Sequence, residues 1–72
     1  MLRTLRLSHG FSQARLARAI GVSAPYLSQV ETGRKPLPAA RAVDVAIALG
    51  LTGDDRALAV GLLILADTAR RP

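Results

Sequence analysis

The polar side chains between residues 12 and 35 have the chemistry of a surface that binds an anionic partner and forms hydrogen bonds with its donor and acceptor groups. They carry amide, hydroxyl and cationic groups, namely Gln13, Ser23, Ser28, Gln29, Arg34 and Lys35. Amides and hydroxyls both donate and accept hydrogen bonds, while guanidinium and ammonium groups pair with phosphate or carboxylate. These side chains can act together only if the elements that carry them place them on one surface.

Two short helices, residues 13–20 and 24–31, are predicted to carry most of these groups. Ser12 and Ser23 precede the helices, and a serine hydroxyl at this position accepts a hydrogen bond from an unpaired backbone amide of the first turn. Gly21 lies between them, where glycine readily adopts the left-handed conformation that ends a helix. The pattern therefore predicts a helix, a tight turn and a second helix.

The apolar positions of these two helices predict which face of each is buried. In the first helix the core stripe consists of Leu16, Ala17 and Ile20. In the second helix Leu27 and Val30 face the core, and the outward positions are Ala24, Pro25, Ser28 and Gln29. Proline is compatible with a first turn because the amides there have no partner within the helix.

Three further helices are predicted at residues 2–8, 38–49 and 54–69, and no strand pattern is present. Helix ends are expected at the first four glycines, residues 10, 21, 33 and 50. The inward stripe expected for residues 38–49 is Ala39, Val43, Ala46 and Leu49. The sequence thus predicts an all-α, compact, five-helix fold, with residues 1–72 forming a single domain.

The last predicted helix has more apolar surface than a domain of this size can easily cover. Residues 58–65 are apolar almost all round, which is typical of a helix buried on more than one face. A 72-residue chain buries only a small core. We therefore expect a homodimer interface on this surplus surface, formed by Ile47, Leu58, Leu62 and Leu65.

Composition narrows the class of function. Ten basic and five acidic residues give a net charge of +5, which favours a polyanionic partner over a merely solvated surface. Half of the residues are hydrophobic, too many for a disordered tail. The absence of cysteine excludes disulfides and thiolate metal sites, and the lone His9 is a poor metal ligand.

Several classes of protein are not expected from this sequence. No nucleophile–base pair or phosphate-cradling glycine loop points to an enzyme, and no cofactor, metal or small-molecule ligand is expected. The apolar run from residue 57 to 66 is shorter than the roughly 20 residues of a membrane span, and no signal peptide is visible. We expect a soluble, cytoplasmic protein.

The spacing of these features resembles the lambda-repressor/Cro-type helix-turn-helix family, also called the XRE family, from Leu2 to Leu51. The matching residues are Arg6, Gly10, Ser12-Gln13, Leu16-Ala17, Gly21-Val22-Ser23, Tyr26-Leu27-Ser28, Glu31, Gly33 and Ala48-Leu49-Gly50. The resemblance implies a DNA-binding transcription regulator, a small phage or chromosomal repressor that binds a palindromic operator in double-stranded DNA as a dimer.

The resemblance also implies roles for individual residues. Base edges would be contacted by Ala24, Pro25, Ser28 and Gln29. Phosphates would be contacted by Gln13, Arg15, Ser23, Tyr26, Thr32, Arg34 and Lys35. Capping remains an alternative role for Ser23, and packing for Tyr26. Arg6 and Glu31 would form a structural ion pair, and Phe11 is expected in the core.

Two other functions remain open on the sequence. The same fold occurs in antitoxins and other protein-interaction modules, in which residues 54–69 would cover a protein partner. A helical bundle without a nucleic-acid role is the other alternative, although the arginines near residues 13–31 argue against it.

Overall fold

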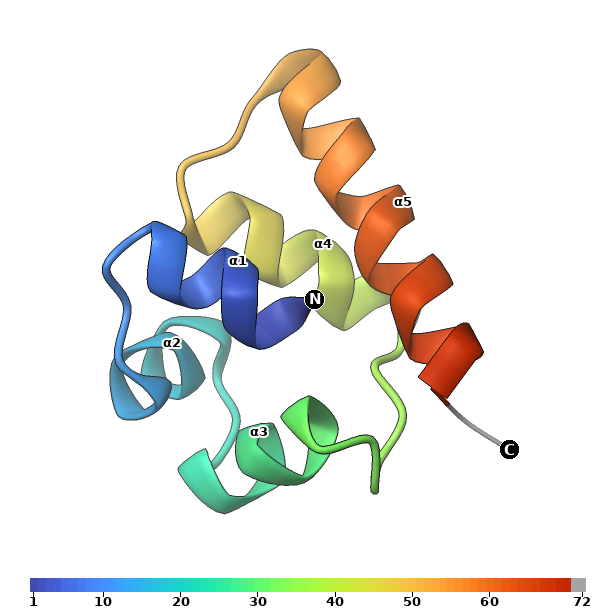
Figure 1. The fold of residues 1–72 in the computed structure, drawn as a ribbon. Helices are drawn as coiled ribbons and strands as arrows, with labels where there is room; N and C mark the ends of the chain where they lie inside the picture. The colour runs from blue at the N-terminus through green and yellow to red at the C-terminus, as the bar shows by residue number, and fades with distance from the viewer. Residues whose placement is uncertain (71–72) are drawn as a thin grey trace.

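The computed structural model describes residues 1–70, which form five helices (Figure 1). The helices are α1 (Leu2–Ser8), α2 (Gln13–Ile20), α3 (Ala24–Glu31), α4 (Ala39–Ala48) and α5 (Gly53–Arg70). Residues 1–70 contain no strand. The predicted all-α, five-helix fold is therefore confirmed, and helix bounds differ from the prediction by one residue at each end of α4 and α5.

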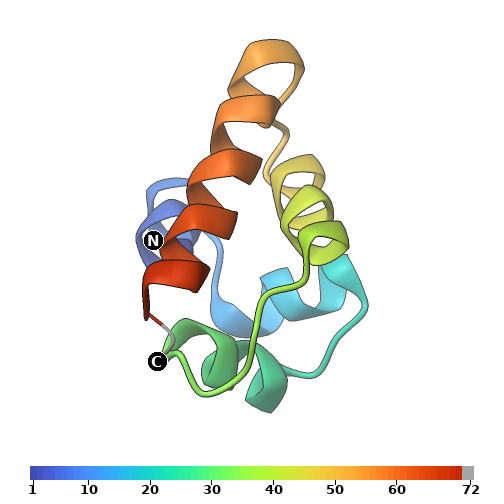
Figure 2. The ribbon, with the colours of Figure 1, turned by 90° about the vertical axis from the view of Figure 1, so that its right-hand side faces the viewer.

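The arrangement of the helices separates two ends of the molecule. α2 packs against both α3 and α4, and α5 packs along α4. Two views related by a 90° turn show α3 at one end and the start of α5 at the opposite end (Figures 1 and 2). The helix pair α2–α3 therefore forms one end of the protein, and α5 forms much of one side.

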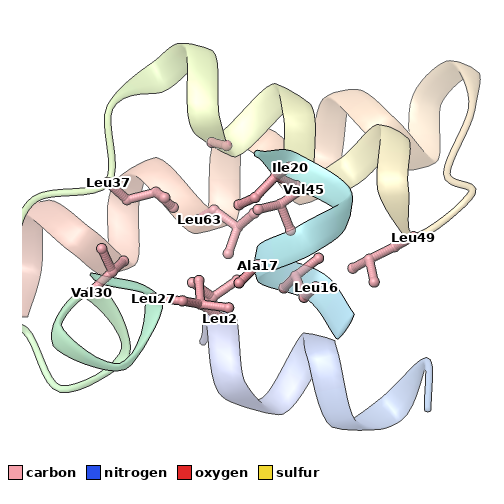
Figure 3. Close-up of a cluster of buried hydrophobic side chains, with 11 residues drawn as sticks. Leu2, Leu16, Ala17, Ile20, Leu27, Val30, Leu37, Val45, Leu49 and Leu63 are labelled. Atoms are coloured by element: carbon pink, nitrogen blue, oxygen red, sulfur yellow. The ribbon is translucent and has the colours of Figure 1, made fainter. Parts of the chain in front are cut away.

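All five helices contribute to one apolar core (Figure 3). Its members include Leu2, Leu16, Ala17, Ile20, Leu27, Val30, Leu37, Val45, Leu49 and Leu63. Burying one such leucine or valine side chain stabilises the fold by about 1.5–3 kcal/mol. The stripe predicted for α2 and the inward positions predicted for α3 are confirmed.

The buried face predicted for α4 is wrong in part. The buried residues of this helix are Ala42, Val45 and Ala46, followed by Leu49, whereas Ala39 and Val43 are exposed. The segment is apolar at so many positions that periodicity allowed two helix rotations. A contact of Arg41 favours the observed rotation of α4. Its guanidinium donates a hydrogen bond to the carbonyl of Ile20 at 2.8 Å, so the side of α4 that carries Arg41 faces the end of α2.

The turn between α2 and α3 is built by two hydrogen bonds around Gly21, which has a φ of 76°. The Gly21 amide donates to Arg18 O at 3.3 Å, and the Val22 amide donates to Ala17 O at 2.9 Å. These bonds satisfy the last carbonyls of α2 and reverse the chain direction. The same pair of bonds closes α1, α3 and α4 at Gly10–Phe11, Gly33–Arg34 and Gly50–Leu51.

α5 buries only one face within the chain. Ala59 and Leu63 are buried, whereas Leu58, Leu62 and Leu65 keep 63%, 40% and 66% of their surface exposed. The three leucines follow an i, i+4, i+7 spacing and so share one helix face. The single chain therefore leaves an apolar stripe uncovered on α5.

Candidate nucleic-acid interface

The solvent-exposed face of α3 carries both an apolar and a polar side chain. Pro25 and Gln29 are exposed one turn apart, while Leu27 and Val30 are buried beneath them. Ser28 is half-buried. The predicted outward position of Ala24 needs correction, because its side chain is half-buried and packs against the core.

Serine caps begin both helices of the pair. The Ser12 hydroxyl accepts a hydrogen bond from the Arg15 amide at 3.0 Å, and the Ser23 hydroxyl accepts one from the Tyr26 amide at 3.1 Å. A cap of this kind stabilises a helix by about 1 kcal/mol. The structure thus shows Ser23 in its capping role, which leaves its phosphate contact a prediction.

The basic loop after α3, which we define as residues 32–36, is held against the helix by backbone hydrogen bonds, and one carbonyl accepts the amides of both basic residues. Gln29 O accepts the amides of Arg34 at 2.8 Å and Lys35 at 3.2 Å. The Thr32 hydroxyl donates to Ser28 O and also lies 3.2 Å from Gln29 O, so its proton is engaged within the chain. The backbone of Arg34 and Lys35 is therefore fixed, while both side chains are exposed.

Tyr26 holds the other end of the basic loop. Its hydroxyl donates a hydrogen bond to Pro36 O at 3.2 Å, and its half-buried ring packs against the core. This arrangement favours packing as the main role of the residue, while the hydroxyl oxygen stays free to accept a further bond. Tyr26 thereby joins the first turn of α3 to the end of the basic loop.

The end of α3 departs from the other helix ends in one respect. A helix that ends in this hydrogen-bond pattern commonly packs an apolar side chain just after the glycine. Phe11, Val22 and Leu51 take that place after α1, α2 and α4, and all three pack against the core. After α3 the place is taken by Arg34, which is exposed. Here the chain presents a cation where its other helix ends bury an apolar group.

The start of α2 places two further polar side chains. The Gln13 amide group donates to Glu31 Oε1 at 3.1 Å, which leaves its second N–H for another acceptor. The Arg15 guanidinium lies 4.2 Å from the centroid of the Phe11 ring, a cation–π contact that restrains an exposed side chain. Phe11 itself is half-buried and not fully in the core.

Arg6 and Glu31 are brought together although they lie on α1 and α3. Arg6 Nε is 2.7 Å from Glu31 Oε2, and Arg6 Nη2 is 3.1 Å from Glu31 Oε1. Arg6 Nη1 also donates to the carbonyl of Phe11 at 2.8 Å. The structure therefore contains the ion pair that the family resemblance implies.

Two contacts around the helix pair lie outside the sequence prediction. One is the bond from Arg6 to the Phe11 carbonyl, and the other is the bond from Arg41 to the Ile20 carbonyl at the end of α2. A basic residue near a helix C-terminus is a known partner for its last carbonyls. However, a separation of 21 residues carries no local signal of that contact.

Charge is unevenly distributed along the chain. Seven of the ten basic residues, but only one of the five acidic residues, lie within residues 1–41, which include α1, α2 and α3. Asp54 and Asp55 lie in the first turn of α5, as predicted, at the far end of the molecule from α3 (Figure 1). The part of the chain that includes the helix pair is therefore the more basic part.

The described residues, 1–70, contain no cluster of His, Cys, Asp and Glu side chains suitable for a metal ion. None of the helices described is both long and apolar enough to span a membrane.

The geometry of α2, the Gly21 turn and α3 defines a helix-turn-helix protein. A family model described as a helix-turn-helix domain matches residues 1–59 of the 72, and the chain belongs to this family. Comparison with curated proteins gave no match, and comparison with solved structures gave none. Membership of the helix-turn-helix family indicates a DNA-binding regulator.

Proposed function

We propose that this protein is a transcription regulator of the lambda-repressor/Cro type that binds specific sequences in double-stranded DNA. The observation that carries the proposal is the pairing of an exposed Gln29 side chain with a rigidly held basic loop. The Gln29 backbone carbonyl fixes Arg34 and Lys35 beside the same turn whose side chain faces solvent. The same residue, Gln29, thus presents the side chain that contacts a base and holds in place the two residues that bind phosphates.

Each group has a distinct task on DNA. The Gln29 amide pairs with N6 and N7 of adenine in the major groove, and Ser28 can donate to or accept from several bases. Arg34 and Lys35 bind phosphates and set the register of α3. The free N–H of Gln13 and the unpaired first amides of α2 bind a phosphate on the other side of the groove.

Repression requires only that the bound protein occupies a promoter. Proteins of this type bind two half-sites roughly 34–36 Å apart as symmetric dimers. We assign the dimer contact to the exposed stripe of Leu58, Leu62 and Leu65, with Ile47, which is 51% exposed on α4, as a further member.

A groove beside the stripe supports this assignment. Its volume is about 220 Å³, and it is lined by Met1, Leu5, Leu51, Asp55, Leu58, Ala59 and Leu62. An apolar cavity of roughly 150 Å³ is large enough to bind benzene. The groove can therefore receive an apolar side chain of a second copy. Ile47 and Leu65 do not line the groove, so either of them could supply that side chain.

The decisive test is selection of duplexes from a random-sequence pool, followed by affinity measurements on a selected duplex. We expect wild type to enrich a two-fold symmetric sequence. Gln29→Ala should weaken binding by about 1–3 kcal/mol and relax the preference at one base pair in each half-site. The control Lys35→Ala should weaken all duplexes alike. Absence of enrichment, even in dilute salt, would refute the proposal.

A further inference from the structure

The first turn of α3 offers few hydrogen-bond donors. Pro25 has no amide proton, and the amide of Tyr26 is already bonded to the Ser23 hydroxyl. Ala24 contributes a methyl group that lies half-buried against the core. At the start of α2 two amides, those of Gln13 and Ala14, have no partner within the helix, whereas the first turn of α3 keeps only the Ala24 amide. The start of α2 therefore suits a phosphate better than the start of α3, where the Pro25 ring is exposed.

Pro25 nevertheless lies on the face that carries Gln29. Both side chains are exposed and are four residues apart, so they lie one above the other on the helix. This spacing corresponds to about 6 Å along the helix axis, and successive base pairs are about 3.4 Å apart. If Gln29 contacts a base edge, the Pro25 ring reaches a base pair one or two steps away.

We propose that the Pro25 ring recognises the 5-methyl group of a pyrimidine in the major groove. The proposal rests on the DNA-binding function proposed above and deepens it by naming the chemical group that the first turn of α3 reads. The thymine methyl group projects into the major groove and is bound by apolar contact. A cytosine amino group or guanine carbonyl in its place would lose water and gain no hydrogen bond from Pro25, which is unfavourable.

The contribution of one methyl group to the binding affinity can be stated in advance. Removing one buried methyl group from the DNA should weaken binding about fourfold. Two sources can supply the group, thymine and 5-methylcytosine. Each half-site should therefore contain a methylated pyrimidine one or two base pairs from the adenine that Gln29 contacts.

The test starts from a duplex that the wild-type protein selects from a random pool. Each thymine is replaced in turn by deoxyuridine, which lacks only the methyl group. We expect one position in each half-site at which the replacement weakens wild-type binding about fourfold. At that position a 5-methylcytosine–guanine pair should bind more tightly than a cytosine–guanine pair.

Two variants assign the effect to a residue. Pro25→Ser keeps a small residue in an exposed first turn and should bind the thymine and deoxyuridine duplexes equally. Gln29→Ala, one turn away, should bind more weakly but keep the fourfold difference. Circular dichroism and thermal unfolding of both variants check that the fold is intact.

The outcomes separate this proposal from the proposed function. Failure to select any duplex would end both. Selection without any effect of deoxyuridine, or with 5-methylcytosine no better than cytosine, would overturn methyl recognition and leave DNA binding in place. A thymine preference that persists in Pro25→Ser would overturn the assignment to Pro25.

Discussion

Arg6 and Glu31 meet through two hydrogen bonds, at 2.7 and 3.1 Å, with only 8% and 4% of their side chains exposed. Glu31 is the last residue of α3, and Arg6 lies on α1. Gln13, at the start of α2, donates to the same carboxylate. The orientation of α3 relative to the other two helices therefore depends on one buried charged group.

Replacing one partner of this pair should destabilise the fold strongly. In Glu31→Gln the Arg6 guanidinium stays buried without a counter-charge, so we expect a loss of about 3–5 kcal/mol of unfolding free energy. Urea denaturation followed by circular dichroism measures the change. A double variant, Arg6→Met with Glu31→Leu, removes both charges and should recover part of the loss. A loss below about 1 kcal/mol in Glu31→Gln would contradict the structural role.

Removing the charges of the basic loop should weaken binding to every duplex. In Arg34→Ala with Lys35→Ala we expect the slope of log affinity against log salt to flatten by about 0.9 for each lost phosphate contact. Fluorescence anisotropy titrations at several salt concentrations measure this slope. Arg3→Ala removes one exposed positive charge from α1 and serves as a control that should leave the slope nearly unchanged. Equal slopes for all three proteins would rule out the assigned contacts.

A charge within the α5 stripe should prevent dimer formation without unfolding the chain. Leu65 is 66% exposed, so Leu65→Glu leaves the core intact but places a carboxylate in the proposed contact. We expect the mass from light scattering to fall from dimer to monomer and affinity for a two-half-site duplex to fall with it. Ala57→Glu adds the same charge at an exposed position of α5 that is not three or four residues from any leucine of the stripe, and this variant should remain dimeric. A monomeric wild type, with or without DNA, would refute the interface.

Two glycine-to-alanine changes should have opposite effects on stability. Gly21 has a φ of 76°, and Gly61 lies within α5. Among the described residues, an added Cβ at either glycine would meet no atom within 4 Å other than those of its chain neighbours and, for Gly61, of the adjacent helix backbone. Gly21→Ala should cost about 1–2 kcal/mol because alanine disfavours the left-handed conformation. Gly61→Ala should add about 0.5–1 kcal/mol because alanine favours a helix interior. Thermal unfolding measures both, and changes of the same sign would contradict the backbone argument.

Local patterns in the sequence were sufficient for the helices and their ends. The serines at 12 and 23 and the glycines at 21 and 33 act through hydrogen bonds to residues at most five positions away. Such contacts repeat in many proteins with similar spacing, so they can be predicted from residue type and position. The buried stripe of α2 was equally clear, because its polar and apolar positions alternate with the helix period.

The rotation of α4 and the surroundings of the candidate site depended on contacts between distant residues. Val43 and Val45 are alike in residue type, and only packing against α2 and α5 decides that Val45 is buried and Val43 is exposed. Likewise, the far end of the basic loop is held by the bond from Tyr26 to Pro36, a residue ten positions along the chain.

Residue order alone was enough to predict an all-helical chain, its helix-turn-helix pair and most of the residue types on the outer face of α3. Helix propensity, capping and apolar periodicity act over a few residues, so they can be recognised in short stretches of the sequence. By contrast, the face of α4 that enters the core and the partial burial of Ala24 depend on how the helices pack against one another. The hydroxyl of Thr32 is likewise engaged within the chain. These features depend on how the helices and the loops pack against one another, and that packing exists only once the chain has folded.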